Sequence, residues 1–264
     1  MSDYIKYNGA KGHIPVVKAG DGGLRLISFD LLLLDEGMEY SEDTGGSEVC
    51  IVILGGRATV SCGGNTWENI GVRKNVFDGP GAGVYVPRDA SFTFKASHGY
   101  VEAAVLRTLT DEKFAPAYIS PDMVNIVHRG KDNWSRTVHD ILDDRTPAGN
   151  MLVGETFSPP GNWSSAPPHR HDVENPPIET DHEEIYFFKV EPEQGFQLIR
   201  LYTDDYSLNT TYCVEQNDTV IIKQGYHPVA AGPGYKGYYL WLLAGKSRKI
   251  CPRDDPRHQW LKDT

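Results

Sequence analysis

The residues with the clearest chemical potential are two histidines one residue apart, in the run Pro167-Pro168-His169-Arg170-His171-Asp172. Side chains of a β-strand alternate between its two faces, so an extended His-x-His places both imidazoles on one face and Arg170 on the other. Neutral imidazole nitrogens are good ligands for borderline divalent metals. The spacing of His169 and His171 therefore predicts part of a metal site.

A carboxylate and a third histidine follow on segments that read as neighbouring strands. Residues 184–190 are rich in aromatic and β-branched side chains, which is typical of a strand, and Glu184 opens that run. His227 stands in Gly225-Tyr226-His227-Pro228, just after the strand-like residues 218–223. Three imidazoles and one carboxylate would suit zinc, manganese or iron. We interpret this set as the active site.

The spacing does not by itself choose the carboxylate ligand. His182 and Glu183 compete with Glu184, because the loop that precedes them is long. His182 shares a face with Glu184 if the strand begins early enough. The other histidines are expected to be structural: His13, His98, His128, His139 and His258.

Further polar and aromatic side chains lie on segments expected to line the same barrel. Arg200 and Tyr202 share one strand face and could bind a carboxylate as a pair. Lys223 ends another predicted strand. The competing interpretation is a solvated outer face for Arg200 and Lys223, and core packing for Tyr202, Tyr239 and Trp241.

Short strand-like segments separated by turns position these residues. Glycine (27) and proline (17) are frequent and spread along the chain of 264 residues, which favours an all-β fold. Residues 1–110 and 151–264 share this rhythm, and residues 111–150 read as a polar connector. The sequence predicts two related β-barrels, of which only the second carries His-x-His. A structural or oligomerisation role is expected for the first, and a homo-oligomer for the protein.

Charge and hydropathy exclude several classes of partner. The net charge is −10, with 36 acidic against 26 basic residues and no basic cluster, so nucleic acid is not expected as a partner. A small anionic substrate remains compatible, because a few local cations suffice. Without a signal peptide, a long apolar run or a disulfide-type cysteine pattern, we expect a cytoplasmic protein that does not enter the membrane.

The set His-x-His, Glu and His resembles the signature of the cupin family, with an enlarged gap before the glutamate. Over nearly the whole chain the sequence more closely resembles the bacterial 5-deoxy-glucuronate isomerase family of inositol catabolism. The matching segments are residues 73–77, 84–87, 133–136, 138–139, 162–172, 183–186, 202–205 and 225–235.

This resemblance implies a bicupin, that is, two double-stranded β-helix (jelly-roll) barrels, with a divalent metal in the second. Its ligands would be His169, His171, Glu184 and His227, so the resemblance favours Glu184 over its rivals. Zinc is the expected metal, with manganese or iron possible. Two departures are Ala166, where the family often has an aromatic residue, and His182, where it tends to be apolar.

The implied reaction is an aldose–ketose isomerisation of 5-deoxy-glucuronate to 5-dehydro-2-deoxy-gluconate. It requires moving a proton from C2 to C1, for which Glu155, Tyr239 or a loosely bound Glu184 are the candidate groups. The alternatives are the related 4-deoxy-5-hexosulose-uronate ketol-isomerase activity, a cupin dioxygenase, and a non-enzymatic sugar-binding cupin.

Overall fold

The computed structural model describes residues 2–263, and nearly all of its regular elements are β-strands. The exceptions are four short 3-10 helices: η1 (Asp21–Gly23), η2 (Pro121–Met123), η3 (Asp132–Trp134) and η4 (Gln259–Asp263). The described residues contain no α-helix, which confirms the predicted all-β class. Nor do they contain a helix with the length and apolar character needed to cross a membrane.

Two compact units share the described residues. The N-terminal unit comprises residues 8–125 and 140–153, and the C-terminal unit comprises residues 2–7, 126–139 and 154–263. The chain therefore passes between the units several times, and its first residues belong to the C-terminal unit. The domain limits expected from the sequence, 1–110, 111–150 and 151–264, stay a prediction.

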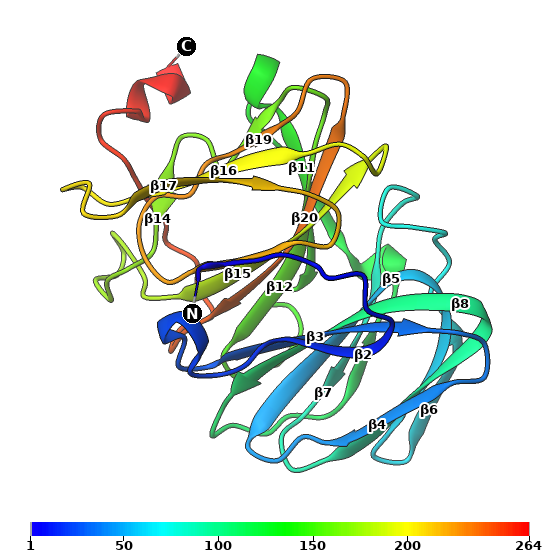
Figure 1. Ribbon diagram of the computed structural model, residues 1–264. Coiled ribbons are helices and arrows are strands. Elements are labelled where there is room, and N and C mark those ends of the chain that lie inside the picture. Colours follow the sequence, from blue (N-terminus) through cyan, green and yellow to red (C-terminus); the bar gives the residue numbers. More distant parts are fainter. Residues whose placement is uncertain (1, 264) are drawn as a thin grey trace. The chain divides into compact units, whose positions relative to one another are not determined.

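One large antiparallel sheet forms the N-terminal unit (Figure 1). Along the sheet the strands follow the order β2 (Gly12–Val17), β3 (Ile27–Leu34), β8 (Ser91–Leu109), β5 (Ser47–Cys62), β7 (Ala82–Val86) and β9 (Ala117–Ile119). Two more strands pair at the sides, β4 (Glu39–Asp43) with β8 and β6 (Asn65–Ile70) with β5. The long strands β5 and β8 slip register around Gly55 and Arg57, and such bulges bend a strand so that one sheet can curl around its own core.

Apolar side chains fill the inside of this curl. Leu32, Val49, Ile51, Phe94 and Val105 belong to one cluster of buried residues. These side chains come from β3, β5 and β8, whose alternating residues face the same interior. Burial of this kind supplies most of the stabilisation of a β-barrel.

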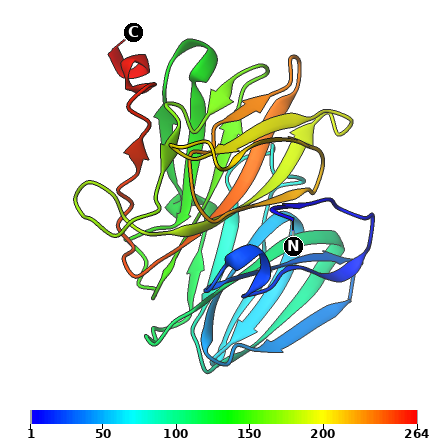
Figure 2. The same ribbon diagram turned by 60° about the vertical axis from the view of Figure 1, so that its left-hand side comes forward.

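Three further sheets are built mostly from residues of the C-terminal unit (Figures 1 and 2). The first has the order β1 (Tyr4–Ile5), β18 (Thr219–Ile222), β15 (Glu183–Glu191), β20 (Lys236–Ala244), β12 (Met151–Ser158), β11 (Arg136–Leu142) and β10 (Asn125–Arg129). The second has the order β13 (Trp163–Ser164), β19 (Val229–Ala231), β16 (Gln197–Tyr202) and β17 (Asn209–Val214). A short third sheet pairs β14 (His169–Arg170) with β21 (Arg253–Asp254).

Strand register decides which side chains of the seven-stranded sheet share a face. Glu184 pairs with Leu243, Tyr186 with Trp241, and Phe188 with Tyr239. Directly paired residues of antiparallel strands point to the same side, so Glu184, Tyr186 and Tyr239 lie on one face of the sheet. We call this the site face. Tyr238, the neighbour of Tyr239 in the chain, points to the opposite face.

The chain's first strand completes the same sheet from far away in the sequence. In β1, Tyr4 pairs with Val220 of β18. The Tyr4 hydroxyl also donates a hydrogen bond of 2.7 Å to the Asp218 carboxylate, which accepts a second one from the Tyr7 amide at 2.9 Å. These contacts cover an edge of the sheet that would otherwise expose unpaired backbone groups.

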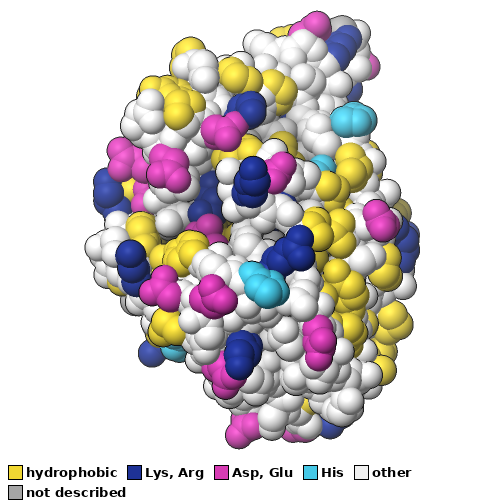
Figure 3. Space-filling view, turned by 90° about the vertical axis from the view of Figure 1, so that its right-hand side faces the viewer, with side chains coloured by type: hydrophobic (Ala, Val, Ile, Leu, Met, Phe, Trp, Pro, Cys, Tyr) yellow, Lys and Arg dark blue, Asp and Glu magenta, His cyan; other side chains and the backbone are white. Residues whose placement is uncertain are grey.

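Charged side chains of both signs are interspersed on the molecular face drawn in Figure 3. Lysine and arginine stand there among aspartate and glutamate and do not gather into one continuous basic patch. This face therefore lacks the clustered cations that a nucleic-acid backbone requires.

Candidate metal centre

Three buried side chains, His171, Glu184 and His227, converge on one point of the C-terminal unit. We call these three residues the metal group. One ligand atom from each lies within 4.8 Å of the other two. The Glu184 carboxylate oxygen Oε2 is 3.0 Å from His171 Nε2 and 3.5 Å from His227 Nε2. Two imidazole nitrogens facing one carboxylate form a mixed nitrogen and oxygen donor set, which can hold a divalent metal.

Backbone carbonyls fix the orientation of both imidazoles. His171 Nδ1 lies 2.7 Å from the carbonyl oxygen of His182, and His227 Nδ1 lies 3.0 Å from that of Gly225. A carbonyl can only accept, so each Nδ1 donates a proton and each Nε2 is free to direct a lone pair at Glu184. Such second hydrogen bonds are the usual support of metal-binding histidines.

His227 provides the observation that best tests a metal. Its Nε2 is buried and has no hydrogen-bond partner in the structure. A buried nitrogen lone pair without a donor costs free energy, and a bound cation would remove that cost. Burial, together with the neighbouring His169 and His171, also holds the pKa of His227 well below its ordinary value, so its nitrogen stays neutral. The residues present therefore fit a metal.

His169 stands beside this group rather than inside the closest triangle. Its ring centroid is 4.8 Å from that of His227, and the residue is half-buried at the start of β14. Burial, His171 and, more weakly, Arg136 and Lys262 lower the pKa of His169 to about 3. The neutral imidazole keeps the nitrogen lone pair that a metal ligand needs.

A hydrogen bond of 3.0 Å joins Glu184 and His171 and couples their titration. Burial raises the pKa of Glu184, although His171 opposes that shift. Burial alone would lower the pKa of His171, but the hydrogen bond and charge of Glu184 outweigh burial and raise it. Metal ligands must be deprotonated, so protons and a metal would compete for this pair.

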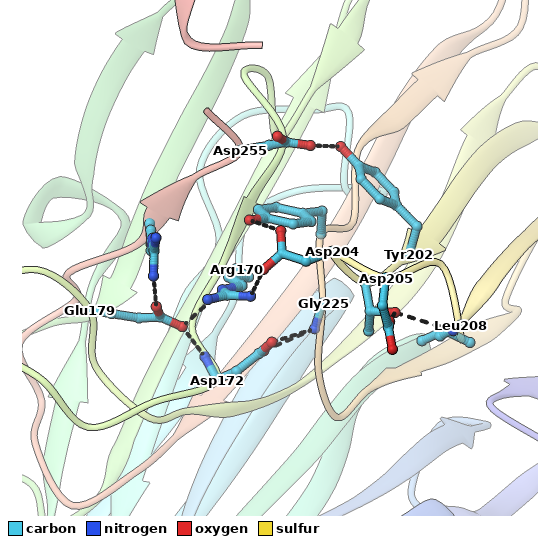
Figure 4. Close-up of polar contacts among 12 residues, drawn as sticks. Arg170, Asp172, Glu179, Tyr202, Asp204, Asp205, Leu208, Gly225 and Asp255 are labelled. Atoms are coloured by element: carbon cyan, nitrogen blue, oxygen red, sulfur yellow. Dashed lines mark hydrogen bonds and ion pairs between the residues drawn. The ribbon is translucent and has the colours of Figure 1, made fainter. Parts of the chain in front are cut away.

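A glycine turn delivers His227 to the group. Gly225 has a φ of +86°, and a Cβ at this position would lie 2.5 Å from the Tyr202 carbonyl oxygen. Only glycine combines this left-handed conformation with so close a backbone approach. The Gly225 amide donates to both oxygens of Asp172 at 2.9 Å, which ties the His-x-His segment to the turn (Figure 4).

Arg170 and Asp172 lie on the face of this segment away from the metal group. Arg170 forms ion pairs with Asp204 at 2.5 Å and with Glu179 at 3.4 Å (Figure 4). Glu179 in turn accepts the Asp172 amide at 2.8 Å. These contacts connect the loop after His171 to the β16–β17 turn and so hold His169 and His171 in place.

The two rivals of Glu184 have other positions. His182 Nε2 donates to the Ser247 carbonyl at 2.7 Å, so this ring is directed away from the metal group while its backbone oxygen supports His171. Glu183 pairs with Ala244 and faces the side of β15 opposite Glu184.

The candidates for proton transfer fall on different faces of the sheet. Tyr239 shares the site face and stacks on Tyr186 at a centroid distance of 4.3 Å. Both hydroxyls reach Ser165 Oγ, Tyr186 at 3.2 Å and Tyr239 at 3.4 Å. Glu155 lies on the opposite face, where its carboxylate accepts the Tyr238 hydroxyl at 2.8 Å. Ser165 was not singled out from the sequence, because a lone serine in a loop carries no pattern.

The three residues expected to bind substrate lie apart from the metal group. Arg200 packs over the ring of Tyr202 at 4.3 Å and donates to the Asn209 side chain, while the Tyr202 hydroxyl donates to Asp255 at 2.8 Å. Arg200 belongs to the half-exposed face of β16, opposite its buried neighbours Ile199 and Leu201. Lys223 is also partly exposed, 3.3 Å from Asp3. Their assignment to substrate stays a prediction.

Comparison with known proteins gives the class first. A crystal structure of an IolB-like protein from Salmonella typhimurium LT2 superposes with a TM-score of 0.95 at 33% identity, covering 98% of both chains. The oxalate decarboxylase of Lactobacillus farciminis superposes with a TM-score of 0.69 at 10% identity, over 98% of this chain and 88% of that one, which shows shared fold alone. The fold is therefore that of the bicupins, as predicted.

The sequence places the chain more narrowly. The KduI/IolB family matches residues 5–261, and the chain belongs to this family. A relative named 5-deoxy-glucuronate isomerase from Geobacillus thermodenitrificans is 38% identical over 96% of this chain and 93% of its own length. One of the same name from Bacillus subtilis strain 168 is 38% identical over 93% of this chain and 91% of its own. The protein is an isomerase, and the resemblance found in the sequence is confirmed.

Proposed function

We propose that this isomerase converts 5-deoxy-glucuronate to 5-dehydro-2-deoxy-gluconate, with a divalent metal held by His169, His171, Glu184 and His227. The observation that best supports a metal is the buried His227 Nε2, which faces Glu184 and has no hydrogen-bond partner. The substrate assignment is supported by the relatives from Geobacillus thermodenitrificans and Bacillus subtilis, which are both named 5-deoxy-glucuronate isomerase and are 38% identical over most of the chain.

The chemistry divides between the metal and the chain. When bound, a divalent ion such as zinc would polarise the substrate carbonyl and stabilise the negative charge of an enediolate. Zinc is our first choice because the donor set mixes imidazole and carboxylate, and manganese or iron would accept the same ligands. The chain's residues must bind the substrate, exclude water and carry the proton from C2 to C1.

We assign the proton transfer to the Tyr239 hydroxyl, acting with Tyr186 and Ser165. These hydroxyls form one connected set on the site face. Burial and the nearby Glu184 charge raise the pKa of Tyr186 well above its ordinary value, so Tyr186 keeps its proton and donates hydrogen bonds. Tyr239 Oη can then relay protons while its neighbours orient it: it would take the C2 proton as it gives its own to O1, and then give a proton to C1 as it takes the one on O2, which restores the hydroxyl. Glu155 does not enter this assignment, because it lies on the other face.

Metal analysis combined with an isomerase assay tests the proposal. Purified protein should contain about one metal ion per chain, and chelation should abolish ketose formation from 5-deoxy-glucuronate until metal is restored. Unchanged turnover after complete metal removal would contradict the metal's role. Faster turnover of 4-deoxy-5-hexosulose-uronate would move the substrate to that ketol-isomerase activity, and a requirement for O₂ would indicate a dioxygenase. A homo-oligomer and a cytoplasmic location stay predictions.

A further inference from the structure

Arg136, the first residue of β11, lies on the site face of the seven-stranded sheet. Three positions later, His139 contacts Phe157 at a ring distance of 4.6 Å, and Phe157 contacts Tyr238 at 5.2 Å. His139 therefore shares the face of Tyr238, which is opposite the site face. Arg136 and His139 are three positions apart, an odd offset, so Arg136 points to the side of Tyr186 and Tyr239.

Among residues 2–263, Arg136 has no acidic partner. Its interactions are a hydrogen bond of 3.3 Å from Nη1 to the Trp134 carbonyl and packing over the Trp134 ring at 5.7 Å. Arg107 in the N-terminal unit offers the contrast, since it pairs with Asp30 at 3.0 Å and with Glu42 at 2.5 Å. A half-buried guanidinium without a carboxylate is costly, and a bound anion would compensate for that cost.

The surroundings of Arg136 hold it near the metal group. The loop before it is tied to the segment leading to β13, because the Asn162 side chain donates to the carbonyls of Asp132 and Ser135 at 3.0 Å. That segment continues to Ser165 and His169. Burial and the nearby Arg129 lower the pKa of Arg136, while the two site-face tyrosines oppose this shift.

We propose that Arg136 binds the carboxylate of the sugar-acid substrate and so makes this isomerase specific for acids over neutral sugars. The inference rests on the proposed function and adds a residue that its sequence-based site lacked. Arginine's planar fork matches a carboxylate in a bidentate arrangement. With the substrate's carbonyl end at the metal group, Arg136 would hold its other end and present C1 and C2 to Tyr239.

Binding of a matched pair of open-chain ligands to chelated protein tests this assignment without turnover. Gluconate and glucitol differ by a carboxylate against a hydroxymethyl group, and calorimetry measures both affinities. The wild type should prefer gluconate, and Arg136→Gln should lower gluconate affinity about 10–100-fold while leaving glucitol affinity unchanged. Arg136→Lys should show an intermediate loss, because it keeps the charge without the fork.

Arg129→Ala is the matched control. Arg129 is exposed on the neighbouring strand β10, and the contact between His128 and Thr137 places Arg129 on the same side of the sheet as Arg136, so its removal deletes the same charge nearby. Gluconate affinity should change less than about twofold. Equal losses in Arg129→Ala and Arg136→Gln would overturn the proposal, since a general positive field would then explain the binding. So would equal wild-type affinities for gluconate and glucitol.

Kinetics separate this inference from the proposed function. With 5-deoxy-glucuronate, Arg136→Gln should raise KM about 10–100-fold with a smaller change in kcat, and its melting temperature should show that it is folded. Wild-type turnover with an unaffected Arg136→Gln variant would reject Arg136 and keep the isomerase assignment. An Arg136-dependent preference for gluconate in a protein that does not turn over 5-deoxy-glucuronate would do the reverse.

Discussion

The interiors of the two units differ in the polar side chains that they contain. The core cluster of the N-terminal unit consists of apolar side chains such as Val49, Ile51 and Phe94. In the C-terminal unit, Glu184 of β15 instead points to the interior, where it meets His171 and His227. A barrel filled with aliphatic groups gains stability from packing, whereas buried ionisable groups cost stability and are retained for function.

Two buried glutamates make the contrast specific, because each stands at the start of a central strand. Glu48 accepts hydrogen bonds from the Tyr85 and Thr108 hydroxyls at 2.9 Å and from three backbone amides, those of Gly149, Asn150 and Met151. Glu184 meets two imidazoles, one of which keeps an unpaired Nε2. The two carboxylates are both buried, and they differ in the groups around them: hydroxyls and amides around Glu48, imidazoles around Glu184.

Substitutions in the metal group should have the largest effect on turnover. Glu184→Gln, or His171→Ala, should lower kcat/KM by about 10³-fold or more, since Lewis-acid stabilisation contributes several kcal/mol. Metal content should fall in parallel, as measured by elemental analysis. Glu48→Gln is the matched control, and it should keep both metal and turnover in its folded fraction. Normal metal content in Glu184→Gln would break the comparison.

Removing the fully paired glutamate should instead cost stability. Glu48→Ala leaves three amides and two hydroxyls without their acceptor, which should lower the free energy of unfolding by about 3 kcal/mol or more. Urea unfolding followed by tryptophan fluorescence measures the loss. A variant as stable as the wild type would show that Glu48 is not the anchor that its contacts describe.

The tyrosine pair allows a finer distinction within the C-terminal unit. Tyr239→Phe should lower kcat about 10²-fold, a size typical of losing one proton-transfer group, while metal content stays unchanged. Tyr202→Phe removes a hydroxyl from the half-exposed cluster around Arg200 and serves as the control. Equal kinetic losses in both variants would support Tyr202 as a site residue and contradict a special role for Tyr239.

The smallest effect is expected on the acid stability that a paired carboxylate provides. Burial would raise the pKa of Asp255, but hydrogen bonds from Arg257 and Tyr202 prevail and lower it to about 2. Its stabilisation is present above the ordinary pKa near 4 and is lost as the pH falls toward 2. Between pH 5 and pH 3 the wild type should lose about 1 kcal/mol more stability than Asp255→Asn. Parallel pH profiles of unfolding would refute this pairing.

Local sequence was enough to predict the strands and the ligand types. The His-x-His spacing and the aromatic run after Glu184 depend on a period of two along one strand, which local residues control. The glycine turn before His227 is equally local, since Gly225 adopts a φ that other residues avoid. The all-β class and the family followed from such segments.

Only the tertiary structure decided which strands became neighbours and which faces met. Glu155 and Tyr239 were equal candidates in the sequence, but the order β20–β12–β11 places them on opposite faces. Arg136 shares a sheet with Tyr239 because β11 joins that sheet. Strand β1 pairs with β18, more than two hundred residues away in the sequence. Period two fixes which residues share a face within a strand. The pairing of distant strands depends on how the whole chain buries its apolar surface, which no local pattern encodes.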